Sequence, residues 1–354
     1  MTKLFIICIL SALISYGTIP FIIKYFEGKN LFDRIDSRKT ISFPSIRFGG
    51  LSIYFASLVS FIIISLLNHE IYTDSFKPIY IFLIASFLTF LIGFFDDISQ
   101  KSPYLRLIGQ IIVASFLWDQ FFKIQIIKIP ITIIGYNEIY IPIILSYLIT
   151  IFWLVGLTNA VNWLDGLDGL AGSFSLITLF TISLIFISND NQIFSMFSMS
   201  LAGAVLGFLQ YNIYPSKIIM GDGGANLLGF SLGCLSILAL MPNEFSKNNL
   251  IQINILPFFL LLYPILDMLI VMIKRLLSQK SVFLPDRSHI HFVLIDKGLT
   301  PPQTVLLVIL ASEFCAIFSL LSIDFVYINN IIFGFLIYDC FLIIKTRKYL
   351  LKKT

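Results

Sequence analysis

The chain has 354 residues, of which 58% are hydrophobic and only 12% are charged, and its formal net charge is +4. Soluble globular domains carry about 45–50% apolar and about 25% charged residues, so this composition excludes a soluble enzyme, a disordered chain and a disulfide-built secreted module. It predicts an all-α integral membrane protein in which residues 1–354 form a single polytopic membrane domain. The basic residues have no soluble face on which to gather, so no nucleic-acid partner is expected.

Eleven apolar runs are predicted to cross the membrane, because each approaches the roughly 20 residues that a helix needs to span the hydrocarbon core. In chain order they are residues 4–23, 48–67, 78–95, 104–121, 140–158, 171–188, 193–210, 224–241, 251–273, 303–321 and 330–345. The first run is interpreted as a helix rather than a signal peptide, because no small-residue cleavage site follows it. Between the fourth and fifth runs, residues 122–138 alternate like a strand and contain Pro130, which predicts a small extracytoplasmic β-hairpin.

Lysine and arginine are distributed unequally between the two sides of the predicted membrane domain. Most of the 24 basic residues lie in or next to the loops 24–47, 96–103, 159–170, 211–223 and 274–302, or in the tail after residue 345. The positive-inside rule places this side in the cytoplasm. The N-terminus is then expected outside and the C-terminus in the cytoplasm.

Polar residues gather in four clusters at the predicted cytoplasmic ends of the helices. The clusters are Asp96-Asp97, the segment from Asn159 to Asp168, the segment from Asn212 through Met220-Gly-Asp222-Gly-Gly, and Pro285-Asp-Arg287-Ser-His289-Ile-His291. An acid costs about 2.5–3.5 kcal/mol at the centre of a membrane helix, so this concentration on one face indicates a site. Oxygen ligands without thiolates suit Mg²⁺ or Mn²⁺, which commonly bridge to phosphate. The clusters predict phosphoryl-group chemistry on a lipid.

The spacing within the clusters adds local geometry. Asp96 and Asp97 lie about 100° apart on a helix, so they share one site only if the helix ends there. Asn159, Asn162, Asp165 and Asp168 recur at every third residue, and the interspersed glycines predict a helix that gives way to a turn. The glycines around Asp222 allow backbone N–H groups to approach an anion at a helix N-terminus.

In their order and residue types, these four motifs resemble those of the polyprenyl-phosphate N-acetylhexosamine-1-phosphate transferases. That family includes the bacterial UDP-GlcNAc:undecaprenyl-phosphate GlcNAc-1-phosphate transferases and the phospho-MurNAc-pentapeptide transferase. The resemblance extends from about residue 33 to about residue 300, and the Pro-Asp-Arg-x-His-x-His form is closer to the GlcNAc branch. The chain departs from the family pattern at Ile41, Ala225 and Phe292, none of which is an expected metal ligand.

The resemblance implies that the chain transfers a sugar-1-phosphate, GlcNAc-1-phosphate by default, from a UDP-sugar to undecaprenyl phosphate with release of UMP. It implies a multi-pass protein of the bacterial cytoplasmic (inner) membrane that starts a lipid-linked glycan, with a homodimer as one oligomeric state. Asp222 would be the principal Mg²⁺ ligand, with Mn²⁺ as an alternative metal. The implied catalytic residues are Asp96, Asp97, His289 and His291, with one of the two aspartates as the base. The implied substrate-binding residues are Asn159, Asn162, Asp165, Asp168, Asn212, Arg38, Lys39, Arg47 and Arg287.

Several alternatives stay open beside this interpretation. A secondary transporter also has many helices and buried acids, although its site would lie near the membrane midplane. A pentapeptide-type transferase shares the motifs. A phosphotransferase of the CDP-alcohol type would need an Asp-Gly-x-x-Ala-Arg core, which is absent, and a non-catalytic scaffold would not need the motifs. Asp267, on the face of Lys274 and Arg275, is interpreted either as a structural ion pair or as a neighbour of the site.

Overall fold

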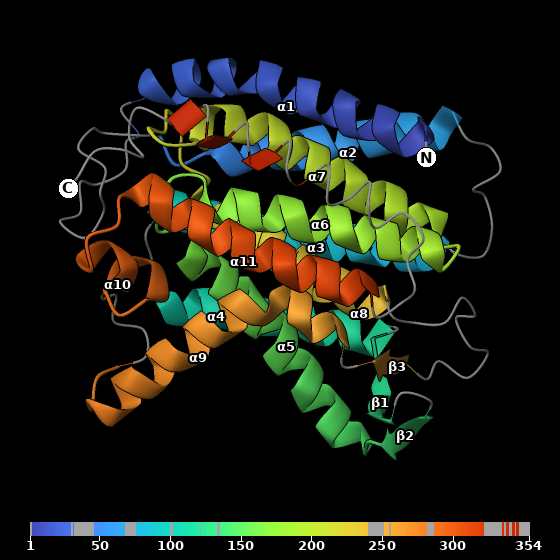
Figure 1. Cartoon of the computed structure of the whole chain (residues 1–354). Helices are drawn as coiled ribbons and strands as arrows, with labels where there is room; N and C mark the ends of the chain where they lie inside the picture. Colours follow the sequence, from blue (N-terminus) through green and yellow to red (C-terminus); the bar gives the residue numbers. More distant parts are fainter. Residues whose placement is uncertain are drawn as a thin grey trace.

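The chain folds into a bundle of helices with a small sheet at one end (Figure 1). The computed structural model describes residues 2–29, 31, 46–67, 76–99, 102–120, 122–132, 135–239, 251–254, 256–281 and 287–321, and seven residues between 335 and 346. The described helices are α1 (Thr2–Glu27), α2 (Gly49–Leu67), α3 (Phe76–Ser99), α4 (Pro103–Gln120), α5 (Ile143–Leu164), α6 (Leu170–Ser188), α7 (Gln192–Asn212), α8 (Gly221–Leu238), the 3₁₀-helix η2 (Leu256–Leu261), α9 (Leu262–Leu277), α10 (Ile290–Asp296) and α11 (Pro301–Leu321).

The structure confirms an all-α integral membrane protein. Seven of the described helices are long and apolar enough to cross a membrane, namely α1, α2, α3, α5, α6, α7 and α11. The predicted runs 104–121 and 224–241 also form helices, α4 and α8, which carry more polar or glycine residues. The predicted run 330–345 lies mostly outside the described residues, and those described within it are helical.

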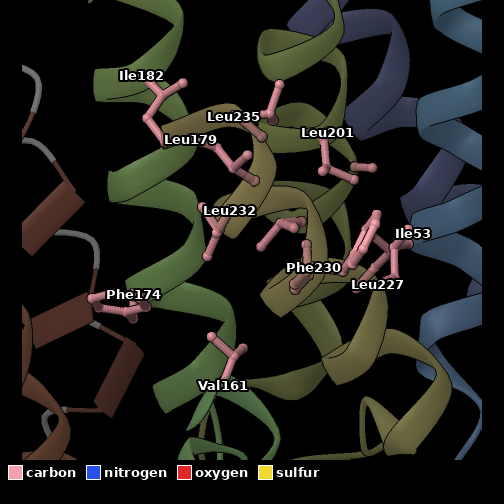
Figure 2. Packing of buried hydrophobic residues seen from close by; sticks show 14 of the residues in the cluster. Ile53, Val161, Phe174, Leu179, Ile182, Leu201, Leu227, Phe230, Leu232 and Leu235 are labelled. Carbon is pink, nitrogen blue, oxygen red and sulfur yellow. The ribbon is translucent and has the colours of Figure 1, made fainter. Parts of the chain in front are cut away.

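Helix α8 is the centre of the bundle. It packs against α2, α3, α5 and α6, and every one of its residues is buried except Asp222. Figure 2 shows its side chains Leu227, Phe230, Leu232 and Leu235 meeting residues of the surrounding helices. A helix enclosed by protein does not need a surface as apolar as lipid, which explains how α8 accommodates its glycines and Asn226. Among the residues of α8, Asp222 alone is not fully buried.

Two glycines allow the N-terminus of α8 to lie against its neighbours. Gly221 has a φ of +79°, a conformation that side chains with a Cβ rarely adopt. Gly93 of α3 approaches so closely that a Cβ there would overlap with the backbone of Asp222. The first turn of α8 is therefore held directly against the end of α3, where the adjacent aspartates lie.

The predicted β-hairpin is present. Strands β1 (Ile124–Thr132) and β2 (Gly135–Tyr140) pair antiparallel. The prediction that the ninth run begins at residue 251 is wrong, because Ile251–Asn254 forms strand β3, which pairs parallel with β1. The alternating isoleucines of this segment fit a strand, and helical structure starts only at η2. The sheet lies at the opposite end of the bundle from α10 (Figure 1).

Candidate active site

A cavity of about 1180 Å³ opens between α4, α5, α8 and α9. At one end its lining is polar and comprises Arg47, Arg106, Asn159, Asn162, Asp165, Asp222, Arg275 and His289. The rest is mostly apolar and includes Ile111, Ile124, Leu148, Phe152, Ile237 and Met268. Asp222 is in the first turn of α8 and Ile237 in the last, so the cavity follows this helix for roughly 22 Å. It thus has a charged end and a long apolar extension.

Asp222 is the centre of the charged end. Its Oδ1 accepts a hydrogen bond from Asn162 Nδ2 at 2.8 Å. Two arginines flank the same carboxylate: Arg106 Nη1 lies 3.4 Å from Oδ2, and Arg47 Nη2 lies 3.6 Å from Oδ1. The segment before α2, the start of α4, the end of α5 and the start of α8 therefore converge on one acidic side chain.

Asp97 holds the N-terminus of α8. Its two carboxylate oxygens accept the backbone N–H groups of Asp222 at 2.8 Å and of Gly223 at 2.9 Å. Its side chain is only 2% exposed, and Arg47 Nε lies 3.7 Å away. The sequence predicted that this glycine-rich helix start would accept an anion, and the anion it accepts here is the carboxylate of Asp97. Asp97 thereby fixes the position of Asp222.

Asp96 occupies a different place from its neighbour. Its Oδ2 pairs with Arg106 Nη1 at 3.0 Å, and its carboxyl group is within hydrogen-bonding reach of Asp222. The two adjacent acids reach the same site because α3 ends at Ser99 and the N-terminus of α8 lies beside that end. Sequence reasoning missed Arg106 as a site residue. The available signal was an arginine in the first turn of α4, directly after the loop that follows Asp96.

The segment after α5 turns as predicted. Helix α5 ends at Leu164, Asp165 follows as its C-cap, and Gly169 has a φ of +81°. Asn159 binds the side chain of Gln110 at 2.7 Å and lines the cavity together with Asn162 and Asp165. These predicted substrate-binding residues therefore face the same space as Asp222.

Asp168 and Asn212 lie behind the cavity instead of in its wall. Asp168 accepts the backbone N–H of Ser216 at 2.9 Å. Asn212 accepts the N–H of Gly169 at 3.0 Å and donates to the carbonyl of Ile218 at 2.9 Å. Both side chains tie the turn after α5 to the segment that leads into α8, so in this structure they support the site.

The histidine motif contributes His289 to the cavity. Its Nδ1 lies 2.7 Å from Oδ2 of Asp267, and the other oxygen of Asp267 accepts the N–H of Ile290 at 2.6 Å. Asp267 therefore pairs with His289. The guanidinium group of Arg275 lies over the ring of Trp163, 5.1 Å from its centroid.

The remaining predicted residues lie elsewhere. His291 is fully buried behind Gly166, and neither ring nitrogen has a hydrogen-bond partner within the described part of the chain. Burial lowers the pKa of His291 to about 4, so this ring is neutral near pH 7. Arg287 pairs with Asp296 at 2.6 Å and does not line the cavity. Arg38 and Lys39 lie outside the described residues.

The donor set at the charged end suits a hard divalent cation. Across the described ranges, no three His, Cys, Asp or Glu side chains lie together as a complete metal cage. Mg²⁺ does not need one, since it is held by one or two carboxylates, retained waters and substrate phosphates. Asp96 and Asp222 provide two neighbouring carboxylates with side chains 14% and 18% exposed. The residues present therefore fit Mg²⁺.

Known proteins are similar to this chain over most of its length. Residues 79–240 match the family described as glycosyl transferase family 4. The chain is 30% identical over 278 residues to a probable undecaprenyl-phosphate N-acetylglucosaminyl 1-phosphate transferase of Bacillus subtilis, covering 78% of this chain and 73% of that protein. It is 32% identical over 286 residues to a decaprenyl-phosphate N-acetylglucosaminephosphotransferase of Mycolicibacterium smegmatis, covering 75% and 69%. It is 28% identical over 316 residues to a phospho-N-acetylmuramoyl-pentapeptide-transferase of Staphylococcus haemolyticus, covering 83% and 92%.

Proposed function

The chain belongs to glycosyl transferase family 4, and on that premise we propose that it transfers GlcNAc-1-phosphate from UDP-GlcNAc to undecaprenyl phosphate and releases UMP. The observation that carries this proposal is the form of the cavity. Its charged end surrounds Asp222, and its apolar extension follows α8 toward Ile237. A substrate with a phosphate head and a long hydrocarbon tail has the same two parts.

The charged end supplies the cations that two phosphate substrates require. Arg47 and Arg106 line the cavity and contact Asp222. Guanidinium groups bind phosphate oxygens in bidentate fashion. When substrate phosphates enter, these arginines orient the pyrophosphate and the lipid phosphate, which would otherwise repel each other.

Asp222 would hold Mg²⁺ at this end, with Asp96 beside the metal. When bound, Mg²⁺ neutralises charge on the pyrophosphate and makes UMP a better leaving group. Asn162 fixes the orientation of the Asp222 carboxylate through the 2.8 Å hydrogen bond to Oδ1. A hydrogen bond from a neighbouring side chain keeps a metal-binding carboxylate in the orientation that the metal requires.

Of the two adjacent acids, Asp96 is the better base. Both oxygens of Asp97 already accept backbone N–H groups, so Asp97 acts as a structural anchor. Asp96 pairs with Arg106, which lines the cavity, and would accept the proton of a singly protonated lipid phosphate. The phosphate oxygen then attacks the β-phosphorus of the UDP-sugar, and UMP departs.

The orientation in the membrane follows from the charge distribution. The polar ends of α3, α5, α8 and α9 would face the cytoplasm, where UDP-sugars are found, in a bacterial inner membrane. This puts the N-terminus outside and the C-terminus inside. The sheet formed by β1, β2 and β3 would then lie on the outer side, because it is at the other end of the bundle from α10 (Figure 1).

The direct test is UMP release by the purified protein. UDP-GlcNAc should yield UMP only when both undecaprenyl phosphate and Mg²⁺ are present. UDP-GalNAc and UDP-MurNAc-pentapeptide serve as competing donors, because a relative of the pentapeptide type is also similar to this chain. UMP release from the pentapeptide donor alone would assign the chain to that branch. No lipid-dependent release from any donor would refute the proposal.

A further inference from the structure

Asp267 reaches the site only through another residue. It lies in α9 with 2% of its surface exposed, and it does not line the cavity. Its Oδ2 lies 2.7 Å from Nδ1 of His289, which does line the cavity. Its Oδ1 accepts the N–H of Ile290 at 2.6 Å, the first residue of α10. Both oxygens of this buried carboxylate therefore contact the segment that holds His289 and Ile290.

The imidazole ring of His289 is also confined by its neighbours. The ring of His291 lies nearly parallel to it, with centroids 5.4 Å apart and an angle of 17°. The indole of Trp163 meets it edge-on at 5.6 Å and 74°. These two rings hold the plane of the His289 ring, and the contact with Asp267 orients its Nδ1 within that plane.

This arrangement fixes the tautomer of His289. An ionised carboxylate can only accept hydrogen bonds, so the proton of the neutral ring is on Nδ1. The lone pair is then on Nε2, at the opposite edge of a ring that lines the cavity. The hydrogen bond made by one ring nitrogen decides which nitrogen is available to a ligand.

We propose that Asp267 is a positioning residue for the transfer reaction, and that it holds His289 so that Nε2 accepts a hydrogen bond from a hydroxyl or amide N–H of the donor sugar. The proposal rests on the proposed function for the identity of the donor. A nitrogen lone pair repels phosphate oxygens, whereas an N-acetylhexosamine offers several hydrogen-bond donors. Trp163 and Phe292 line the cavity next to this ring, and pockets of this type combine aromatic walls with a few polar groups that orient the ligand.

Asp267→Asn tests the proposal with little change of shape. The amide oxygen still accepts the N–H of Ile290, but the amide NH₂ now donates to Nδ1 of His289. The proton of the ring then moves to Nε2. Nε2 becomes a hydrogen-bond donor and can no longer accept a hydrogen bond from the hydroxyl or amide N–H of the sugar. A change of this kind preserves geometry and selects the wrong tautomer. Asp119→Asn is the matched control, because Asp119 is exposed on α4 and contacts Lys123 at the far end of the helix.

Two measurements decide the outcome. The chain has only three histidines, so ¹⁵N-histidine NMR can assign the His289 ring from the signals lost in His289→Gln. The wild type should show a protonated Nδ1 and Asp267→Asn a protonated Nε2, at an unchanged melting temperature. Calorimetry without lipid should show UDP-GlcNAc binding about tenfold weaker in Asp267→Asn, as expected for one hydrogen bond replaced by an unfavourable contact, and unchanged in Asp119→Asn.

The proposal is overturned if the wild-type ring carries its proton on Nε2, or if Asp267→Asn binds UDP-GlcNAc as tightly as the wild type. These readouts do not depend on transfer. A protein that binds UDP-GlcNAc through this tautomer but releases no UMP would refute the proposed function and support this inference. A protein that transfers normally with Asp267→Asn would refute this inference alone.

Discussion

Of the two adjacent aspartates, replacement of Asp97 by asparagine should mainly lower stability, whereas replacement of Asp96 should mainly lower activity. Asp97→Asn keeps one acceptor oxygen and turns an NH₂ group toward a backbone N–H of α8. One hydrogen bond to a charged group is lost, worth about 1.5–3 kcal/mol, together with about 0.3–1 kcal/mol from a negative charge at a helix N-terminus. Asp97 is nearly completely buried, so the free energy of unfolding should fall by about 2–4 kcal/mol.

Asp96→Asn should change stability by about 1 kcal/mol or less, because the lost attraction to Arg106 is offset by relief of the repulsion from Asp222. Its kcat should fall at least tenfold with little change in KM for the donor, since a base acts in the transition state. Thermal unfolding in detergent, followed by tryptophan fluorescence, and steady-state UMP release measure the two effects. Asp119→Asn should leave both unchanged. A stable, inactive Asp97→Asn together with a destabilised, active Asp96→Asn would refute the assignment of anchor and base.

Three further predictions concern the metal, a buried histidine and the topology. Asp222→Asn should abolish Mg²⁺-dependent UMP release while leaving expression intact, and activity within about tenfold of wild type would exclude Asp222 as the principal ligand. Burial lowers the pKa of His291 from 6.5 to about 4, so the stability that comes from burying a neutral ring is fully present above pH 6.5 and is lost as the pH falls. The free energy of unfolding should decrease by about 2 kcal/mol between pH 7 and pH 5. The melting temperatures of wild type and His291→Leu should therefore depend differently on pH in that window, and identical profiles would contradict this prediction. Thiol labels introduced at Asn191 should react from outside and those at Ser216 and Ser281 only after permeabilisation, whereas the reverse pattern would invert the proposed orientation.

The sequence was most informative where a motif lies on one continuous segment. The glycine-rich start of α8 and the turn after α5 both formed as predicted, because capping and turn preferences act over a few residues. The prediction was wrong at Ile251–Asn254, where an apolar run predicted to be helical instead extends the sheet through β1. An apolar run of β-branched residues does not by itself distinguish a strand from the start of a helix.

Contacts between distant segments could not be predicted in the same way. Helical spacing placed Asp267 on the face of Lys274 and Arg275, yet its partner is His289, which follows the end of α9. Arg275 instead lies over Trp163. The packing of α5 against α9 brings Arg275 to Trp163, and the chain after α9 returns to bring His289 to Asp267. Spacing along one helix carries no information about either contact.

The charge balance of the site explains why so many motifs converge on one helix end. Three carboxylates, of Asp96, Asp97 and Asp222, face the two guanidinium groups of Arg47 and Arg106. With all five ionised, the cluster carries one net negative charge, which favours a divalent cation and by itself repels phosphate. A bound Mg²⁺ would reverse the sign and leave one net positive charge to attract the pyrophosphate. Removing either arginine would therefore increase the affinity of the site for Mg²⁺ and decrease its affinity for UDP-GlcNAc. An arginine variant in which KM falls for both Mg²⁺ and UDP-GlcNAc would contradict this charge balance.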